Sequence, residues 1–140
     1  MGTVNVRWIG GKQFIGIDST DHSVVLATPD ENVGVKPSDL LAMAVAACTA
    51  VDVVEILRKK RMKLDSLEIS AVSEQDADPP WTFRKIHVIY RLHGENLELQ
   101  AVERAIQLSE EKYCSVAATL RATTEITWEV EITSPVVETV

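Results

Sequence analysis

PSDLLAMAVAACTAVDVVEIL, residues 37–57, is the stretch that decides the fold of this chain. Wound as a helix, it places apolar side chains around most of its circumference. A helix that is hydrophobic on nearly every side has to be surrounded by the rest of the protein. The sequence therefore predicts one long buried helix that carries a single cysteine, Cys48, near its middle.

Signals at both ends of the stretch predict where this helix begins and ends. Pro37 suits the first helical position, and Ser38 and Asp39 place short polar groups where free backbone N–H groups need partners. The basic cluster Arg58–Arg61 follows at the other end, where positive charge interacts favourably with the helix dipole. We expect a helix from Pro37 to about Lys60, and we interpret the cluster as a helix end rather than a nucleic-acid site.

The segments on either side of the helix alternate between apolar and polar residues, which predicts strands. Three short strands precede the helix, and the first two meet at Gly10-Gly11. After the helix we expect two longer strands, a helix, a short helix and a final strand. The expected strands are 3–9, 13–18, 24–27, 67–72, 82–93 and 126–132, and the later helices are 97–111 and 116–121. This order predicts a single α+β domain, residues 1–140, with mostly antiparallel sheets around the long helix.

Charge and hydropathy exclude several classes of function. The chain has 14 Lys and Arg against 21 Asp and Glu, a net charge of −7, so it offers no attractive surface to nucleic acid or to an anionic membrane. The apolar run from Leu40 to Val51 is too short for a transmembrane span, and the first residues form no secretory signal. We therefore expect a cytoplasmic protein whose two cysteines are reduced thiols.

These two cysteines are the candidate reactive groups. Cys48 lies in the middle of an apolar helix, a setting that favours an inert, buried thiol. Cys114 lies just before a predicted helix start, where the local field lowers the pKa of a thiol. If the fold brings them together, they suit a nucleophile and a resolving thiol. The residues alone leave both interpretations of Cys48 open.

The sequence predicts no metal and no cofactor. The three histidines, His22, His87 and His93, do not cluster, and zinc needs three or four converging ligands. Motifs for phosphate-binding loops, serine hydrolases and zinc proteases do not occur. We expect any chemistry to come from the thiols.

Both cysteine segments resemble signatures of the OsmC/Ohr family, the osmotically induced and organic-hydroperoxide-resistance proteins. The first comprises PSDLL, AAC and DVVEIL within residues 37–57, and the second is LSEEKYCSV, residues 108–116. The resemblance is closest to the OsmC-like, YhfA-type branch and extends over nearly the whole chain. It implies an intertwined homodimer in which curved sheets enclose the long helix and active sites lie at the dimer interface.

The resemblance also implies roles for individual residues. Cys48 matches the cysteine that attacks a hydroperoxide and becomes a sulfenic acid, and Cys114 matches the cysteine that condenses with it to a disulfide. A dithiol reductant, lipoyl-type in the organic-hydroperoxide branch, restores the thiols. Lys12, after Gly10-Gly11, stands where catalytic members carry an arginine; lysine keeps the charge but loses the planar, multi-donor fork. Asp39 is the acid nearest to the position of their glutamate.

The cation that holds a Cys48 thiolate stays open at this point. The candidates are Lys12, Arg7, Arg84 and Arg121. Asp39 and Cys48 lie on about opposite sides of the same helix. Asp39 therefore either acts across the dimer or caps the helix.

Two functions remain, because a structural disulfide protein would lose much stability on reduction, which we do not expect. The first is a thiol-dependent peroxidase for organic hydroperoxides, with Cys48 peroxidatic, Cys114 resolving, and supporting electrostatic roles for Lys12 and Asp39. The alternative is a stress-related protein, non-catalytic or weakly catalytic, that binds a small apolar ligand at the dimer interface. The pKa of Cys48 distinguishes them, because a value well below that of a free thiol favours catalysis.

Overall fold

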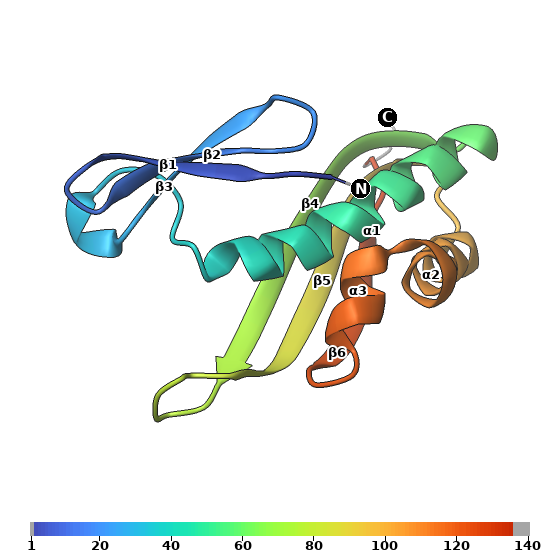
Figure 1. Ribbon diagram of the computed structural model, residues 1–140. Coiled ribbons are helices and arrows are strands. Elements are labelled where there is room, and N and C mark those ends of the chain that lie inside the picture. Colours follow the sequence, from blue (N-terminus) through green and yellow to red (C-terminus); the bar gives the residue numbers. More distant parts are fainter. Residues whose placement is uncertain (1, 136–140) are drawn as a thin grey trace. The chain divides into compact units, whose positions relative to one another are not determined.

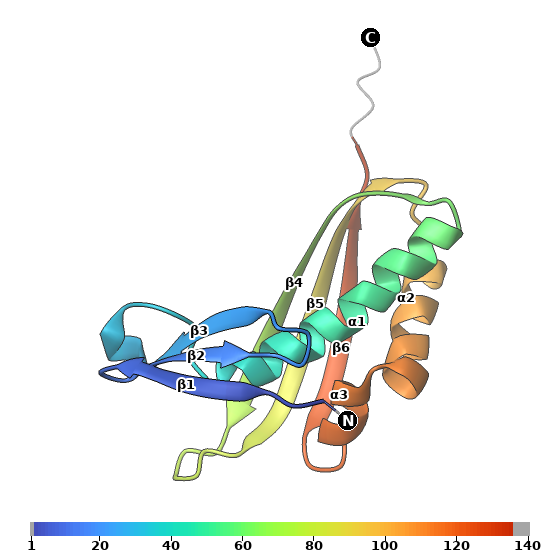
Figure 2. The same ribbon diagram turned by 45° about the horizontal axis from the view of Figure 1, so that its top comes forward.

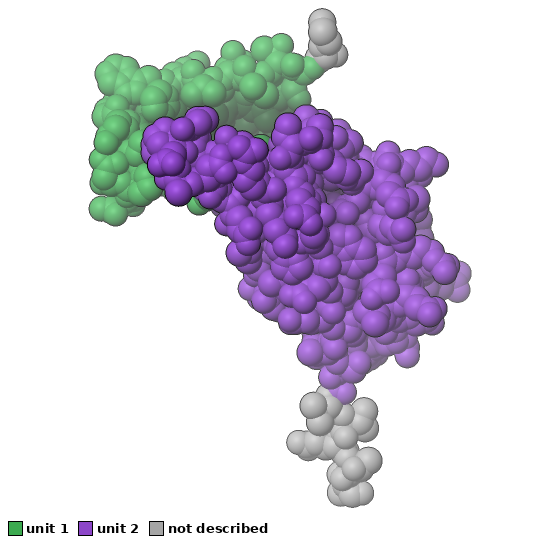
Figure 3. All heavy atoms as spheres, turned by 90° about the horizontal axis from the view of Figure 1, so that it is seen from below, with its two compact units in different colours: residues 1–41 green, residues 42–140 purple. Residues whose placement is uncertain are grey.

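The computed structural model describes residues 2–135, which divide into two compact units (Figure 3). Unit 1 comprises residues 1–41 and unit 2 comprises residues 42–140. Met1 and residues 136–140, which belong to the expected single domain, lie outside the described part of the chain.

Unit 1 contains a three-stranded antiparallel sheet in the order β1–β2–β3 (Figures 1 and 2). Gly10 and Gly11 make the first turn, with φ angles of 116° and 52° that favour glycine. A short 3-10 turn, η1, follows β3. The bounds are β1 Asn5–Gly10, β2 Gln13–Ile17, β3 Ser23–Ala27 and η1 Pro29–Glu31. Each strand lies within two residues of its predicted position.

The long helix, α1, is continuous from Asp39 to Lys59. Its buried residues recur every three or four positions, the spacing of one helix face: Ala42, Val45, Thr49, Val53 and Leu57. A second set of apolar side chains is between 44% and 69% exposed: Met43, Val51 and Val54. The single chain thus covers one face of a helix that the sequence predicts to be surrounded.

Unit 2 contains the second sheet, in the order β4–β5–β6. The strands are β4 Lys63–Gln75, β5 Phe83–Glu95 and β6 Glu125–Thr133. β4 and β5 pair antiparallel, as expected, but β6 runs parallel to β5, with Ile86 opposite Ile126. The reason is the connection: helical segments between β5 and β6 carry the chain back along the sheet, whereas an antiparallel neighbour needs only a hairpin.

One face of β5 forms the core of unit 2 together with α1 and α2 (Figures 1 and 2). Alternate side chains of β5 are at most 1% exposed: Ile86, Val88, Tyr90 and Leu92. The helical members of the same core are Val45, Val53 and Leu57 of α1 and Val102, Ala105 and Ile106 of α2, Leu99–Leu108. Every second side chain of β5 therefore packs in the same core as side chains spaced three or four residues apart on α1 and α2.

The predicted helix 97–111 proves to be two segments. α2 ends at Leu108, and the chain continues as a π-helical turn, η2, Ser109–Tyr113. A short helix, α3, Ser115–Leu120, follows, and its N-cap residue is Cys114. Such π turns insert an extra residue into a helix and occur often at functional sites.

By length and composition alone, α1 is the one helix in residues 2–135 that is long and apolar enough to cross a membrane. The sequence-based expectation of too short a span counted only the uninterrupted apolar run up to Val51. The helix itself continues past Asp52 to Lys59. Five of its side chains are buried, and three belong to the core of unit 2. This burial shows that one face of α1 contributes to the core of unit 2.

Shortening a core side chain of α2 should therefore destabilise unit 2. Ile106 is fully buried, so Ile106→Ala should lower the free energy of unfolding by about 2–5 kcal/mol. The neighbouring Gln107 is exposed, and Gln107→Ala should change it by less than about 0.5 kcal/mol. Urea unfolding followed by circular dichroism measures both, and equal losses would contradict this core.

Candidate functional site

The fold brings together two cysteines that lie far apart in the sequence. Cys48 lies in the middle of α1, and Cys114 lies between η2 and α3. Both are free thiols, and they lie close enough for the Cys114 side chain to raise the pKa of Cys48. The sequence alone did not decide whether the two thiols come together. Their proximity within unit 2 defines the candidate site.

Backbone geometry fixes the position of Cys114. Its N–H donates to the carbonyl of Ser109 over 2.7 Å, which closes the π turn, and its Sγ accepts a 3.3 Å hydrogen bond from the N–H of Ala117. Cys114 is only 2% exposed, whereas Cys48 is partly exposed. A reagent from solvent therefore has better access to Cys48 than to Cys114.

The surroundings of Cys48 favour the neutral thiol. Burial raises its pKa above the ordinary value, and the contact with Cys114 raises it further. The backbone N–H of Val116 lowers the pKa of Cys48, because an N–H dipole favours the thiolate, while the carboxylate of Asp52 raises it. None of the groups in the described part of unit 2 that shift this pKa is a cation. The site in unit 2 holds the thiol pair but does not by itself activate it.

Three polar side-chain atoms near the thiols are buried without hydrogen-bond partners in residues 2–135. They are Thr49 Oγ1, Tyr90 Oη and Glu110 Oε1. Burial raises the pKa of Tyr90 above its usual range, and the charges of Glu110 and both thiols raise it further, whereas the Thr49 hydroxyl lowers it. Burial likewise raises the pKa of Glu110 against the lowering effects of Arg121 and Trp128.

The sequence pattern does not mark these three residues, for different reasons. Tyr90 has the alternation of a core strand and nothing else to distinguish it. Thr49 and Glu110 lie one and four positions from the cysteines, and this proximity in sequence is the only signal that could have found them.

A hydrogen bond links the two segments that carry the thiols. Ser109 Oγ, on the first residue of η2, donates to Asp52 Oδ2 of α1 over 2.5 Å. Ser109 is fully buried. Asp52 follows Cys48 by one helical turn, so the two side chains share a face of α1.

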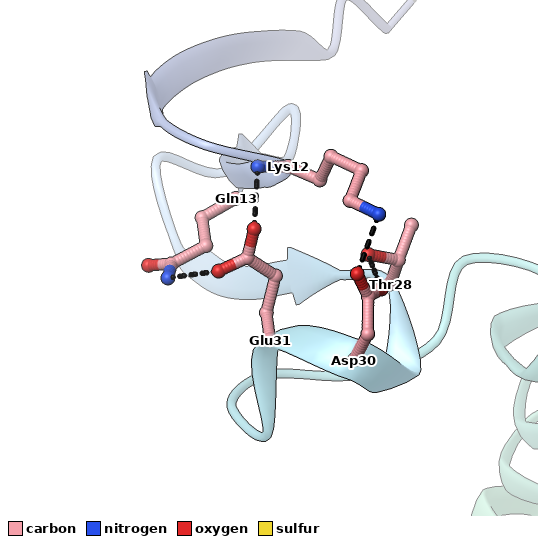
Figure 4. A network of polar contacts seen from close by, with 5 residues as sticks. All are labelled: Lys12, Gln13, Thr28, Asp30 and Glu31. Atoms are coloured by element: carbon pink, nitrogen blue, oxygen red, sulfur yellow. Dashed lines mark hydrogen bonds and ion pairs between the residues drawn. The ribbon is translucent and has the colours of Figure 1, made fainter.

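Lys12 lies in a local network of unit 1 (Figure 4). Its Nζ pairs with Asp30 Oδ2 at 2.5 Å, and its backbone N–H donates to Glu31 Oε1 at 2.8 Å. Glu31 also accepts from the side-chain amide of Gln13, and Asp30 accepts from Thr28. The Asp30 carboxylate raises the pKa of Lys12, and in return Lys12 helps to lower the pKa of Asp30 to about 2.

Four other predicted residues lie elsewhere in the structure, and Arg7 is an exposed residue of β1 in unit 1. Asp39 is exposed in the first turn of α1 and belongs to unit 1, as does Lys12, whereas both thiols belong to unit 2. Arg84 pairs with Asp76 at 2.7 Å, and Arg121 donates to the carbonyl oxygen of Glu110 at 2.7 Å. Within unit 2, neither arginine is therefore directed at Cys48.

Each unit has a surface cavity. The cavity in unit 2 has a volume of about 290 Å³, and its lining includes Asp52 and Tyr113, so it opens beside the segments that carry the thiols. The cavity in unit 1, of about 340 Å³, is lined mostly by apolar side chains of the first sheet, including Val6, Ile17 and Leu26. Among residues 2–135, no group of three or more His, Cys, Asp or Glu side chains is placed to hold a metal ion.

The chain belongs to the OsmC-like protein family, because the model of that family matches residues 29–129. It is 34% identical to protein YhfA of Escherichia coli K12 over 127 residues, which cover 91% of this chain and 95% of YhfA. This similarity places it in the YhfA-type branch.

Solved structures share the fold. A hypothetical protein from Aquifex aeolicus superposes with a TM-score of 0.85 at 27% identity, and the match covers 96% of this chain and 98% of the other. The organic hydroperoxide resistance protein OhrB of Bacillus subtilis superposes with a TM-score of 0.61 at 17% identity, covering 94% and 98%. At that identity the second likeness shows the fold alone.

Removing the groups that oppose ionisation should lower the pKa of Cys48. Cys114→Ala removes the larger influence and should lower the pKa more than Asp52→Asn, which removes one negative charge. Alkylation of the Cys48 thiolate should accordingly extend to lower pH in both variants. The pH dependence of Cys48 alkylation measures this, with Glu55→Gln on the same helix as the control. An unchanged pH profile in Cys114→Ala would show that the thiols are not in contact.

Proposed function

We propose that the protein is a thiol-dependent peroxidase that reduces organic hydroperoxides. The observation that carries this proposal is the proximity of a partly exposed thiol, Cys48, to a buried one, Cys114. The exposed thiol suits attack on a reagent from solvent, and the buried thiol suits resolution of the product. A general link to hydroperoxide resistance is supported by membership of the OsmC-like family and by the name of the Bacillus subtilis neighbour. The name YhfA indicates no chemistry.

The proposed reaction has two steps. The Cys48 thiolate attacks the terminal oxygen of the hydroperoxide, the O–O bond breaks, and an alcohol leaves after taking up a proton, so that Cys48 becomes a sulfenic acid. The Cys114 sulfur then attacks the Cys48 sulfur, the S–O bond breaks, and water leaves with the thiol proton. A dithiol reductant, of lipoyl type, exchanges with the resulting disulfide and restores both thiols while it is itself oxidised.

The positive charge that Cys48 lacks is proposed to come from Lys12, with Asp39 in a supporting role. The Lys12–Asp30 ion pair is exposed and screened by solvent, so exchange of its partner costs little. Arginine in this position would add a planar fork of donors, so lysine is expected to be the weaker activator.

We further propose that the two units form one OsmC-like domain and that two copies form an intertwined homodimer in the cytoplasm. The family match, residues 29–129, spans the boundary between the units. The exposed apolar side chains of α1 and β1 support an association of this kind: Met43, Val51, Val54, Val6 and Trp8. Such a surface on a soluble chain commonly marks an interface.

One observation favours a second candidate function. The pKa of Cys48 is raised rather than lowered, which suits a protein with weak or no catalysis. The apolar cavity of unit 1 offers a site for a small apolar ligand in that case. This alternative predicts ligand binding that survives replacement of both cysteines.

Replacing each thiol separately tests the proposal. Cys48→Ser should reduce hydroperoxide consumption to the uncatalysed background, because the nucleophile is absent. Cys114→Ser should still react once but should accumulate a Cys48 sulfenic acid, detectable by a dimedone adduct in mass spectrometry, and should over-oxidise with excess peroxide.

Ser115→Ala is the matched control, since Ser115 is exposed and lies next to Cys114. It should consume hydroperoxide as the unmodified protein does. Turnover that persists undiminished in Cys48→Ser would exclude the peroxidase and leave the ligand-binding alternative.

A further inference from the structure

We propose that Asp52 and Ser109 are positioning residues whose hydrogen bond sets the separation of the Cys48 and Cys114 sulfurs for disulfide formation. The proposal deepens the proposed peroxidase function, in which that disulfide is the second step. It is carried by three features of the structure: the place of each residue relative to a thiol, the burial of the bond, and the π turn between Ser109 and Cys114.

Both ends of the bond are tied closely to a cysteine. Asp52 lies one helical turn after Cys48 on α1, and a helix keeps such residues in a fixed relation. Ser109 begins the π turn that ends at Cys114, and its carbonyl accepts the Cys114 N–H at 2.7 Å. The path from one thiol to the other therefore runs through one turn of α1, the Ser109–Asp52 hydrogen bond and one π turn.

The Ser109–Asp52 hydrogen bond is short, charge-assisted and shielded from solvent on the Ser109 side. Its length is 2.5 Å, and its acceptor is a carboxylate, which makes a hydrogen bond shorter and stronger than a neutral pair. Ser109 is 0% exposed, so its hydroxyl has no solvent to replace Asp52 if that partner is lost. A hydroxyl on the first residue of the π turn is thereby fixed to α1.

The π turn makes this fixation important. A π turn carries one more residue than an α turn, and the α form is by far the commoner geometry of a helix. Each residue turns an α-helix by about 100°, so even a shift of one residue in the turn would direct Cys114 away from α1. The Asp52–Ser109 bond opposes that shift at the start of the turn, and the cap of Sγ on Ala117 opposes it at the end.

Asp52 disfavours the Cys48 thiolate, and a positioning role explains why a carboxylate nevertheless lies there. Its carboxylate raises the pKa of Cys48 and so works against the thiolate that attacks a peroxide. A residue selected only to activate the nucleophile would be neutral or positive. Asp52 instead serves the second step at some expense to the first.

A pair of variants separates the bond from the charge. Ser109→Ala keeps the Asp52 charge but removes the donor, whereas Asp52→Asn removes the charge but keeps a side-chain oxygen that accepts from Ser109. Ser115→Ala, next to Cys114 and exposed, is the control for a neighbouring loss of a hydroxyl. Urea unfolding establishes that each variant is folded before the thiols are measured.

The first readout follows the two chemical steps in a single turnover with cumene hydroperoxide. Ser109→Ala should form the sulfenic acid at the unmodified rate but close the disulfide at least about tenfold more slowly, since misplacement of reacting groups slows a step strongly. Asp52→Asn should form the sulfenic acid faster and close the disulfide within about threefold of the unmodified rate, because a neutral acceptor is weaker than a carboxylate but keeps the geometry.

The second readout does not depend on peroxidase activity. Diamide oxidises two thiols to a disulfide and is reduced to the hydrazine, so it measures closure of the Cys48–Cys114 pair directly. Slower closure in Ser109→Ala than in Ser115→Ala is expected with this reagent too. Should the unmodified protein ignore hydroperoxide yet show this difference with diamide, the peroxidase would fail while the positioning role would stand.

The result that overturns the proposal is equally specific. Closure in Ser109→Ala at the rate of the unmodified protein, with either oxidant, would show that the bond does not position the thiols. Equal slowing of both steps in Ser109→Ala would also overturn it, because a general disturbance of the site does not distinguish the second step from the first.

Discussion

The packing of one face of α1 against β5 and α2 is the constraint on which the rest of the structure depends. Val53 and Leu57 of α1 share one buried cluster with Ile86, Val88 and Leu92 of β5, all nearly without exposure. Burial of this apolar surface holds the helix that carries Cys48 in a fixed place over the sheet. The same core holds α2, and α2 leads directly into the turn that carries Cys114. The thiol contact is thus a consequence of hydrophobic packing.

The site separates placing the thiols from activating them. Unit 2 provides the placement through the core, the π turn and the Asp52–Ser109 hydrogen bond. It provides no cation for Cys48 from its described residues, and its carboxylate and second sulfur favour the neutral thiol. A complete peroxidase site therefore requires a positive charge from outside unit 2, for which Lys12 is our proposal. The apolar face of α1 that the single chain leaves exposed suits a site completed by association.

The periodicity of apolar residues predicts most of the fold. Alternation locates all six strands, and the apolar run locates α1 to within two residues. Periodicity does not reveal that β6 runs parallel to β5, because pairing direction depends on the connection rather than on the strand itself. Nor does it reveal the π turn at Ser109, because Leu108 and the residues after it continue an ordinary helical pattern.

For the site, the sequence proposes both cysteines, and the family resemblance predicts that they act as a pair. It does not identify Thr49, Tyr90 and Glu110 as a buried polar group, since each acquires its surroundings only when α1, β5 and η2 pack together. Mass spectrometry of the unreduced protein after one equivalent of cumene hydroperoxide tests the central claim most directly. We expect a Cys48–Cys114 linked peptide from a single chain, two hydrogen atoms lighter than the separate peptides. Recovery of both cysteines as unmodified thiols would contradict it.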